Sequence, residues 1–252
     1  MVAKSHIDGA QAFFDECNLI LERIQRTQLA AIRQAASAVA DAVSNDGLLF
    51  TLGTGHSYSL AMEAFARAGG LLPVQQIVCS NLSMVDGSAR SGRTERLEGY
   101  AACILDDYDM RAGDVMLVVS NSGRNAVPIE AAMIARDRGL TVIALTNLTH
   151  SRAVASRHSS QQRLCDVADI VLDNCGMPGD AVVSFPQLAQ RVAATSTVAG
   201  AMLVQSLVAE AVSILIARGI TPPILVSANV DSPLREKVKQ EVTNLSRPLK
   251  HR

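Results

Sequence analysis

The stretch DVMLVVSNSGRNAVPIEAAMIARDRGLTVIALTN, residues 114–147, decides the fold expected for this chain of 252 residues. It begins with an apolar, mostly β-branched run at 115–119 and continues through small polar residues at 120–125. A helical pattern over 128–138 and a second apolar run at 141–145 follow. Strands that are apolar throughout are buried on both faces, and a helix between two of them is typical of a parallel sheet.

The same alternation extends on both sides of this stretch. Three more strands are predicted, at 48–52, 74–78 and 170–172. Helices are predicted at 57–68, 99–106 and 187–218, and a polar loop at 80–96. Apolar residues at helical spacing without proline also predict one N-terminal helix over about 7–43. We therefore predict an α/β fold with a doubly wound, five-stranded parallel sheet flanked by helices, including N-terminal and C-terminal helices.

The domain organisation expected from this pattern is a single domain spanning residues 1–252. The helix at 7–43 precedes an α/β core at about 48–218, and a tail at 219–252 follows it. The tail carries an apolar stretch and then a charged, helix-like stretch. We expect it to extend toward a partner subunit.

Composition excludes several functional classes. The net charge is −1, aromatic residues make up 3% and tryptophan is absent, so nucleic-acid binding is not expected. Five cysteines without a C-x-x-C pair are typical of a reducing cytoplasm, and neither a metal site nor a cofactor is predicted. The segment 197–217 is nearly long enough to cross a bilayer, but polar residues including Glu210 interrupt it. We expect a buried helix there and no membrane association.

Two loops that follow predicted strands have the composition of an anion-binding site. The first is Gly53-Thr54-Gly55-His56-Ser57 and the second is Ser120-Asn121-Ser122-Gly123-Arg124-Asn125. Glycines let the backbone approach a ligand, and hydroxyls and free amides donate hydrogen bonds to it. Ordinary turn and helix-capping chemistry is the alternative for each loop. Neither loop matches a nucleotide P-loop or the G-x-G-x-x-G dinucleotide fingerprint.

These motifs, together with LFTLGTGHSYSLAMEAFARAGG at 49–70, resemble the SIS (sugar isomerase) family of phosphosugar isomerases and phosphosugar-binding proteins. The segments SRH at 156–158 and DNCGMPGDA at 173–181 resemble an uncharacterised branch of that family. The resemblance implies a flavodoxin-like sheet and a phosphorylated sugar as ligand. The phosphate-binding hydroxyls of the family fall on Ser57, Ser120 and Ser122, while its last Thr or Ser is replaced by Asn125. We also expect ligand contacts from Gly55, Asn121, Gly123 and His158.

Isomerisation of a sugar phosphate needs a base and an acid near the sugar carbons. Four residues are candidates: Glu63, Glu95, Glu210 and His56. Each also has a non-catalytic explanation. Glu63 can be a surface charge and Glu95 part of a solvated loop. Glu210 can form an ion pair at a subunit interface, and His56 can be a capping or packing residue. Glu210 is notable because it interrupts an apolar helix, near the place where heptose-phosphate isomerases of the SIS family carry a catalytic histidine.

Three functions therefore stay open. The chain is expected to be an isomerase of a sugar phosphate or amino-sugar phosphate that uses enediol chemistry, a non-catalytic phosphosugar sensor, or a sugar-phosphate lyase or etherase. The resemblance also implies a homodimer or homotetramer. A DNA-binding regulator is disfavoured, because the residues before the first strand have the pattern of one helix rather than of a helix-turn-helix domain.

Overall fold

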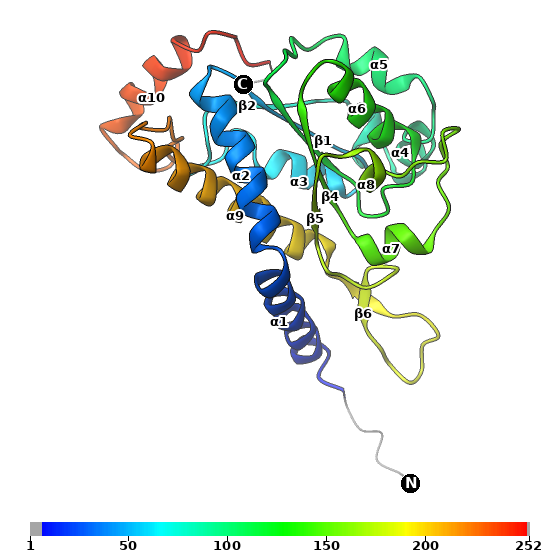
Figure 1. Cartoon of the computed structure of the whole chain (residues 1–252). Helices are drawn as coiled ribbons and strands as arrows, with labels where there is room; N and C mark the ends of the chain where they lie inside the picture. Colours follow the sequence, from blue (N-terminus) through cyan, green and yellow to red (C-terminus); the bar gives the residue numbers. More distant parts are fainter. Residues whose placement is uncertain (1–6, 251–252) are drawn as a thin grey trace.

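The computed structural model describes residues 7–250 and is built around a five-stranded parallel sheet (Figure 1). The strand order is β2–β1–β3–β4–β5, in which the chain winds outward in both directions from β1. This confirms the predicted doubly wound α/β fold with five parallel strands. The strands are β1 (Leu49–Gly53), β2 (Val74–Gln76), β3 (Val115–Val119), β4 (Thr141–Thr146) and β5 (Ile170–Asp173).

Helices cover both faces of the sheet, and each face has its own core. Alternate strand residues point to opposite sides, so Leu49 belongs to one core and Phe50 to the other. The first core is formed with α1 (Gly9–Thr27), α2 (Leu29–Ser44), α3 (Ser57–Glu63) and α9 (Ser196–Ala217). The second is formed with α5 (Tyr100–Leu105), α6 (Ala126–Asp137) and α8 (Leu164–Val167).

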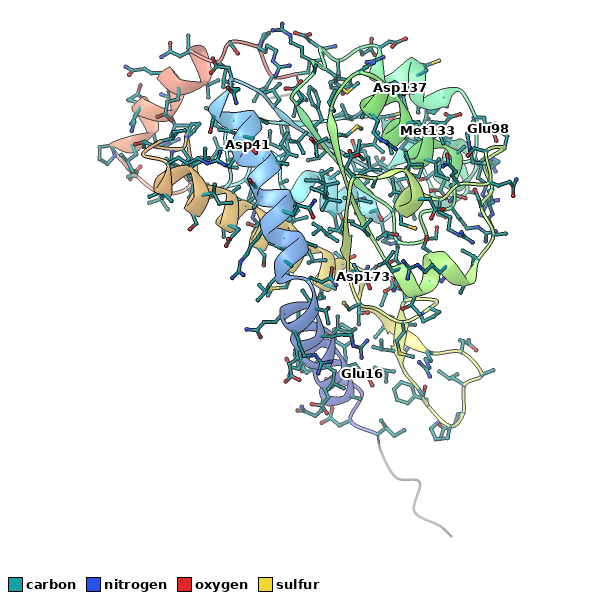
Figure 2. All side chains as sticks on the ribbon, viewed as in Figure 1. Glu16, Asp41, Glu98, Met133, Asp137 and Asp173 are labelled. Carbon is teal, nitrogen blue, oxygen red and sulfur yellow. The ribbon has the colours of Figure 1, made fainter. Side chains whose placement is uncertain are left out.

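The N-terminal segment forms two consecutive helices, where the sequence predicted one. The break lies at Gln28, whose side-chain carbonyl accepts a hydrogen bond from the amide of Asp173 at 3.0 Å. In Figure 2, Asp173 lies beside the junction of the two helices. This contact ties the break to the end of β5, so α2 packs on the sheet while α1 projects beyond it (Figure 1). No proline or glycine marks the break.

Several short elements occupy segments predicted as loop or as longer helix. The polar loop at 80–96 contains the 3₁₀ helix η1 (Ser80–Leu82) and α4 (Ser88–Thr94). The predicted helix at 187–218 begins only at Ser196, because a small antiparallel hairpin, β6 (Ala181–Val183) with β7 (Val192–Ala194), precedes it. The short helix α7 (Leu148–Ala153) follows β4.

The C-terminal tail returns to the sheet of its own chain. After the exposed helix α10 (Leu234–Thr243), Arg247 is buried and donates to the carboxylate of Asp114, with Nη1 2.8 Å from Oδ2. The same carboxylate accepts the amide of Leu48 at 2.8 Å. Breaking a buried ion pair is costly, so this contact holds the tail against the N-terminal ends of β1 and β3.

Helix α9 is the one helix among residues 7–250 that is long and apolar enough to span a membrane. It packs against α2 and α3 over the first core, and 44% of its most apolar window is buried in this chain. Core helices of globular proteins can have the same length and composition as α9. The packing of α9 agrees with the helix expected at 197–217.

Candidate functional site

The two small-residue loops meet at the carboxyl ends of β1 and β3. These strands are neighbours, and the chain leaves them toward opposite faces of the sheet, which is where open α/β sheets bind ligands. A cavity of about 470 Å³ opens there. It is lined by the loop after β1, the loop after β3, the end of α4, one residue of α7, and the segment that enters α9. The lining residues are Thr54, Gly55, His56, Ser57, Glu95, Ser120, Asn121, Ser122, Asn125, His150, Gly179, Asp180, Ala181, Ala194, Ser196 and Thr197.

The first loop makes a turn that only glycine permits at its start. A Cβ on Gly53 would lie 2.2 Å from the carbonyl oxygen of Ser57, so the chain folds back on itself without a side chain between. Gly55 has a φ of 58°, in the left-handed region. The side chains of His56 and Ser57 form no hydrogen bond with any residue in 7–250. They are therefore free to contact a ligand.

The second loop is held from several directions. The amide of Gly123 donates to Oγ of Ser120 at 3.2 Å, and Gly123 has a φ of 58°. The carbonyl of Asn121 accepts the amide of Asn147 at 3.0 Å, and its side-chain oxygen accepts Nδ2 of Asn174 at 2.8 Å. These bonds leave the side chain of Ser122 without a hydrogen-bond partner in the described chain, on the wall of the cavity.

Glu95 joins the two loops. Its Oε2 accepts the hydroxyl of Thr54 at 2.6 Å, and its Oε1 accepts Nδ2 of Asn125 at 2.8 Å. The side-chain oxygen of Asn125 in turn accepts Nη1 of Arg157 at 3.1 Å. Asn125 is the position that departs from the family pattern. An amide donates on one side and accepts on the other, so it bridges a carboxylate and a guanidinium here.

The surroundings of this bridge are rich in arginine. Burial lowers the pKa of Arg157, and the positive charges of Arg124 and Arg96 lower it further, whereas Glu95 opposes the shift. The guanidinium stays charged because the pKa of arginine is so high. One carboxylate among three arginines leaves local positive charge beside the cavity, which favours an anionic ligand.

The third wall is formed by the segment that resembles the uncharacterised SIS branch. Asp180 accepts the amides of Thr195 and Ser196 at 3.0 and 2.7 Å, and the Ser196 hydroxyl at 2.5 Å. It thereby caps the N-terminus of α9 and fixes Ser196 on the cavity wall. Asn174, from the same segment, holds the second loop through Asn121. The segment thus connects α9 to the β3 loop.

Most of the residues predicted for the site meet in this cavity. The eight that line it are Gly55, His56, Ser57, Glu95, Ser120, Asn121, Ser122 and Asn125. Gly123 shapes the second loop behind them. The other lining residues are Thr54, His150, Gly179, Asp180, Ala181, Ala194, Ser196 and Thr197. Thr54 and Asp180 stand in the quoted motifs and could have been proposed from them, but nothing local in the sequence indicates that Ser196 and Thr197 begin a helix.

Three predicted site residues lie outside the cavity. Glu63, at the end of α3, pairs with Arg67 at 2.7 Å and accepts Nε2 of Gln205 at 2.9 Å. Glu210 lies fourteen residues beyond the start of α9, or about 21 Å along the helix, and faces Arg33 at 3.7 Å on a partly exposed surface. His158 lies among carboxylates on α6 and the loop after α4. Within one chain, Glu95 is the predicted carboxylate that reaches the site.

Comparison with known proteins agrees with this architecture. Residues 12–147 match the SIS domain family. A UPF0309 protein of Listeria innocua is 42% identical over 213 residues, covering 84% of this chain and 86% of the relative. A UPF0309 protein of Caldanaerobacter subterraneus is 38% identical over 242 residues, covering 92% and 98%.

Solved structures share the fold at low sequence identity. A phosphoheptose isomerase from Neisseria gonorrhoeae superposes with a TM-score of 0.54 at 19% identity, covering 81% of this chain and 97% of that one. The sugar isomerase domain of an RpiR transcription factor from Sphaerobacter thermophilus gives 0.53 at 18% identity, covering 94% and 98%. An isomerase and a regulator thus share this fold, which therefore does not decide between their functions. The family match and the close relatives establish that the chain belongs to the SIS domain family.

Proposed function

We propose that the chain binds the phosphoryl group of a sugar phosphate in the cavity between the β1 and β3 loops. The hydroxyls of Ser57 and Ser122 have no other partner among residues 7–250, and both line the cavity. Ser120 lies beside them at the start of the second loop. Hydroxyl donors next to glycine turns suit a phosphate dianion, and the nearby arginines favour its charge.

We further propose that the bound sugar phosphate is isomerised, with Glu95 as the base. The observation that carries this proposal is the position of the Glu95 carboxylate, which is in the same cavity as the three serines and held between Thr54 and Asn125. A carboxylate fixed in this way can accept a proton without reorganising. Each of its oxygens keeps a second lone pair for this purpose.

The proposed reaction moves one proton between neighbouring carbons. Glu95 takes the proton from C2 of an aldose phosphate, and the C–H electrons form a C1–C2 double bond as the C1 oxygen is protonated by a neighbouring acid. The hydroxyl on C2 of this enediol then returns a proton to the conjugate base of that acid while C1 gains the proton held by Glu95, which gives the ketose and regenerates both groups. His56 and His150 line the same cavity and are candidates for the acid.

Replacement of Glu95 by glutamine tests this assignment. Glu95→Gln keeps the shape of the side chain but removes the base, so we expect kcat to fall by about 10²–10⁴-fold while affinity for the sugar phosphate changes little. The measurement is exchange of the C2 proton with D₂O followed by NMR over a panel of aldose and ketose phosphates, with Glu63→Gln as the matched control outside the cavity. Full exchange in Glu95→Gln would rule out the proposed base.

A phosphosugar sensor is the second candidate. The observation that favours it is that both oxygens of Glu95 already accept hydrogen bonds, as they would if the carboxylate served only to join the loops. In that case the wild-type chain binds sugar phosphates but exchanges no carbon-bound proton. The D₂O experiment on wild-type protein therefore separates the two candidates.

We also propose that the chain assembles as a homodimer or homotetramer through α1 and α9. Large apolar side chains on these helices are exposed in the single chain, including Phe14 at 61%, Met202 at 48% and Ile216 at 61%. Large apolar and aromatic side chains are enriched in the buried centre of subunit interfaces. We expect sedimentation equilibrium to give a dimer or tetramer, and Phe14→Asp with Ile216→Asp to shift it toward the monomer. A wild-type monomer at micromolar concentration would contradict the proposal.

A further inference from the structure

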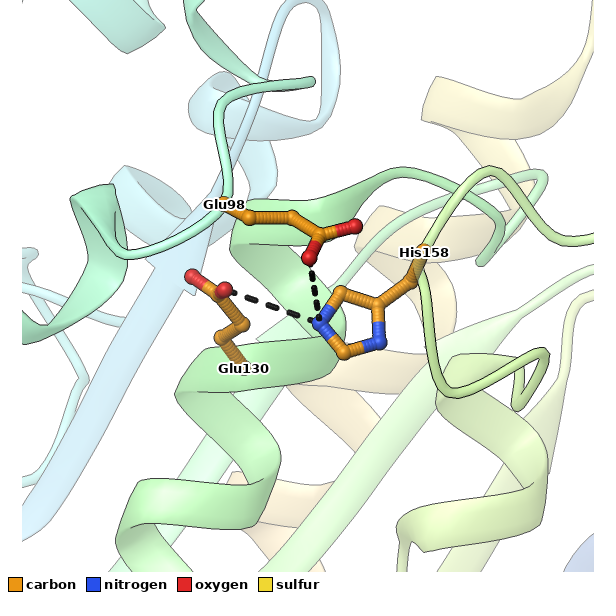
Figure 3. Close-up of side chains that lie close together, drawn as sticks. All are labelled: Glu98, Glu130 and His158. Atoms are coloured by element: carbon orange, nitrogen blue, oxygen red, sulfur yellow. Dashed lines mark ion pairs between the residues drawn. The ribbon is translucent and has the colours of Figure 1, made fainter.

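Glu98, Glu130 and His158 form a cluster outside the cavity, shown in Figure 3. Nε2 of His158 lies 3.5 Å from Oε1 of Glu130 and 4.0 Å from Oε2 of Glu98. The three side chains come from different parts of the chain: the loop after α4, the second turn of α6, and the segment between α7 and α8. They can present three ligand atoms that all lie within 4.8 Å of one another.

One buried polar atom in this cluster lacks a hydrogen-bond partner. Oε2 of Glu130 is buried and accepts no hydrogen bond from any residue in 7–250. The side chain of His158 is only 9% exposed, and its Nε2 points between the carboxylates of Glu98 and Glu130, with which it forms ion pairs (Figure 3). A buried oxygen without a partner is costly, which favours a bound cation beside Oε2 of Glu130.

The distances suit a cation better than a direct contact. A separation of 3.5 Å between Nε2 and a carboxylate oxygen is too long for a good hydrogen bond. Two ligands of one tetrahedral zinc ion, each bound at about 2.0–2.2 Å, lie roughly 3.3–3.5 Å apart. The pair formed by His158 and Glu130 already has this spacing. Oε2 of Glu98 lies 4.0 Å from Nε2, and this partly exposed side chain would have to move closer to bind the same ion.

Neighbouring groups form hydrogen bonds with the three side chains and fix their orientation, as is common for metal ligands in proteins. Glu98 accepts hydrogen bonds from the amide and the hydroxyl of Ser159, both at 2.7 Å. Oε1 of Glu130 accepts the amide of Gly99 at 2.7 Å. Nδ1 of His158 lies 2.7 Å from the hydroxyl of Ser160, which accepts its proton when Nε2 is free to bind a metal. The amide of Ser160 donates to Nδ1 at 3.2 Å, which favours the tautomer with its proton on Nε2. Binding of an ion to Nε2 would therefore release that proton to water, and Nδ1 would take up a proton that the Ser160 hydroxyl accepts.

We propose that Glu98, Glu130 and His158 bind a divalent cation of the zinc class, with water completing its coordination. One imidazole with two carboxylates is a ligand set that zinc accepts, whereas magnesium prefers oxygen ligands alone. Spacing along the sequence did not predict a metal here, because the three ligands are brought together only by the fold.

A metal ion at this site would stabilise the segments beside the candidate cavity. Each ligand stands close in sequence to a residue of the bridge beside the cavity: Glu98 follows Glu95, Glu130 follows Asn125, and His158 follows Arg157. Two sets of contacts therefore join the same three segments. One is the bridge formed by Glu95, Asn125 and Arg157, and the other is the metal cluster. Binding of the ion does not depend on what the cavity binds.

Zinc titration of the tag-free, metal-stripped chain tests the proposal. By isothermal titration calorimetry we expect one ion per chain, confirmed by metal analysis of the dialysed complex. Glu130→Gln and His158→Ala should each weaken zinc binding. Loss of a group that only orients a metal ligand costs roughly 10–100-fold in affinity, so loss of a ligand itself should cost at least as much. Glu22→Gln removes an exposed carboxylate on α1 and should leave binding unchanged.

Glu130→Gln is the deciding variant, because it preserves side-chain shape and is checked for folding by circular dichroism. Absence of zinc binding in the wild-type chain would overturn the proposal. Unchanged zinc affinity in a folded Glu130→Gln variant would overturn it as well, since the ion would then be held elsewhere, for example by cysteines. Magnesium binding as tight as zinc binding would contradict the assignment to the zinc class.

Discussion

The two loops of the cavity face each other but are held in different ways. The β3 loop is tied down by bonds from several elements: Asn121 alone accepts from Asn147 and Asn174, and the amide of Leu164 donates to the carbonyl of Gly123 at 2.8 Å. The β1 loop has fewer contacts with other elements. The amide of Gly55 donates to the carbonyl of Leu82 at 2.8 Å, and the hydroxyl of Thr54 donates to Glu95.

This difference suggests a division of roles. The β3 loop is preorganised and presents Ser122 from a fixed backbone, so a ligand that binds it orders little. The β1 loop is shaped by glycine and carries side chains with no other partner, so its contacts form only when a ligand is present. Removing a side chain that has no other partner in the described chain from the β1 loop should therefore reduce ligand affinity alone, whereas removing a hydrogen-bonded side chain from the β3 loop should also reduce the stability of the fold.

The largest effect is expected at Gly53, which shapes the β1 loop. In Gly53→Ala the added Cβ would meet the backbone of Ser57 at 2.2 Å, so the start of α3 must move. We expect the free energy of unfolding to fall by about 1–3 kcal/mol and sugar-phosphate affinity to fall at least about tenfold. Urea denaturation and calorimetry measure the two quantities. Gly92→Ala is the control, because a Cβ there meets open space; an equal effect at both positions would contradict the reasoning.

A pair of serine substitutions separates the two loops directly. Ser57→Ala removes a hydroxyl without a partner in residues 7–250, so affinity should fall by about 10–100-fold while stability changes by less than about 0.5 kcal/mol. Ser120→Ala removes the acceptor of the Gly123 amide as well, in a buried position. It should therefore also cost about 1–3 kcal/mol of stability. If Ser57→Ala destabilised the fold as much as Ser120→Ala, the two loops would not differ as described.

The regions that the sequence predicted well are those whose pattern is local. The β3 loop lies between an apolar strand and a helix within one continuous stretch, and both its position and its neighbours followed from hydrophobic periodicity. The same holds for all five strands of the sheet. Glu95 and Glu63 show the limit of this reasoning. Each lies in the segment that follows a predicted strand, but the direction of each side chain depends on a partner far away in sequence, Asn125 for Glu95 and Gln205 for Glu63.

Features built from long-range contacts were not predictable. The break at Gln28 depends on an amide of β5, and the β6–β7 hairpin is too short to leave a pattern of alternation. The cavity wall at Ser196 depends on Asp180, which adopts a left-handed φ of 72° and caps a helix that starts sixteen residues later. Sequence therefore located two walls of the cavity, and the fold supplied the third.

The smallest effect on affinity is expected from Asn174, which supports the β3 loop from outside the cavity. Asn174→Ala removes the donor to the Asn121 side chain and the acceptor of the Gly176 amide, both buried or partly buried. Stability should fall by about 1–3 kcal/mol, because these groups lose their partners. Affinity should fall only a few-fold, since Asn174 does not line the cavity and the backbone bonds of the loop remain. Thermal denaturation and calorimetry against the exposed Asn18→Ala control measure this. A larger loss of affinity than in Ser57→Ala would mean that the β3 loop is no more preorganised than the β1 loop.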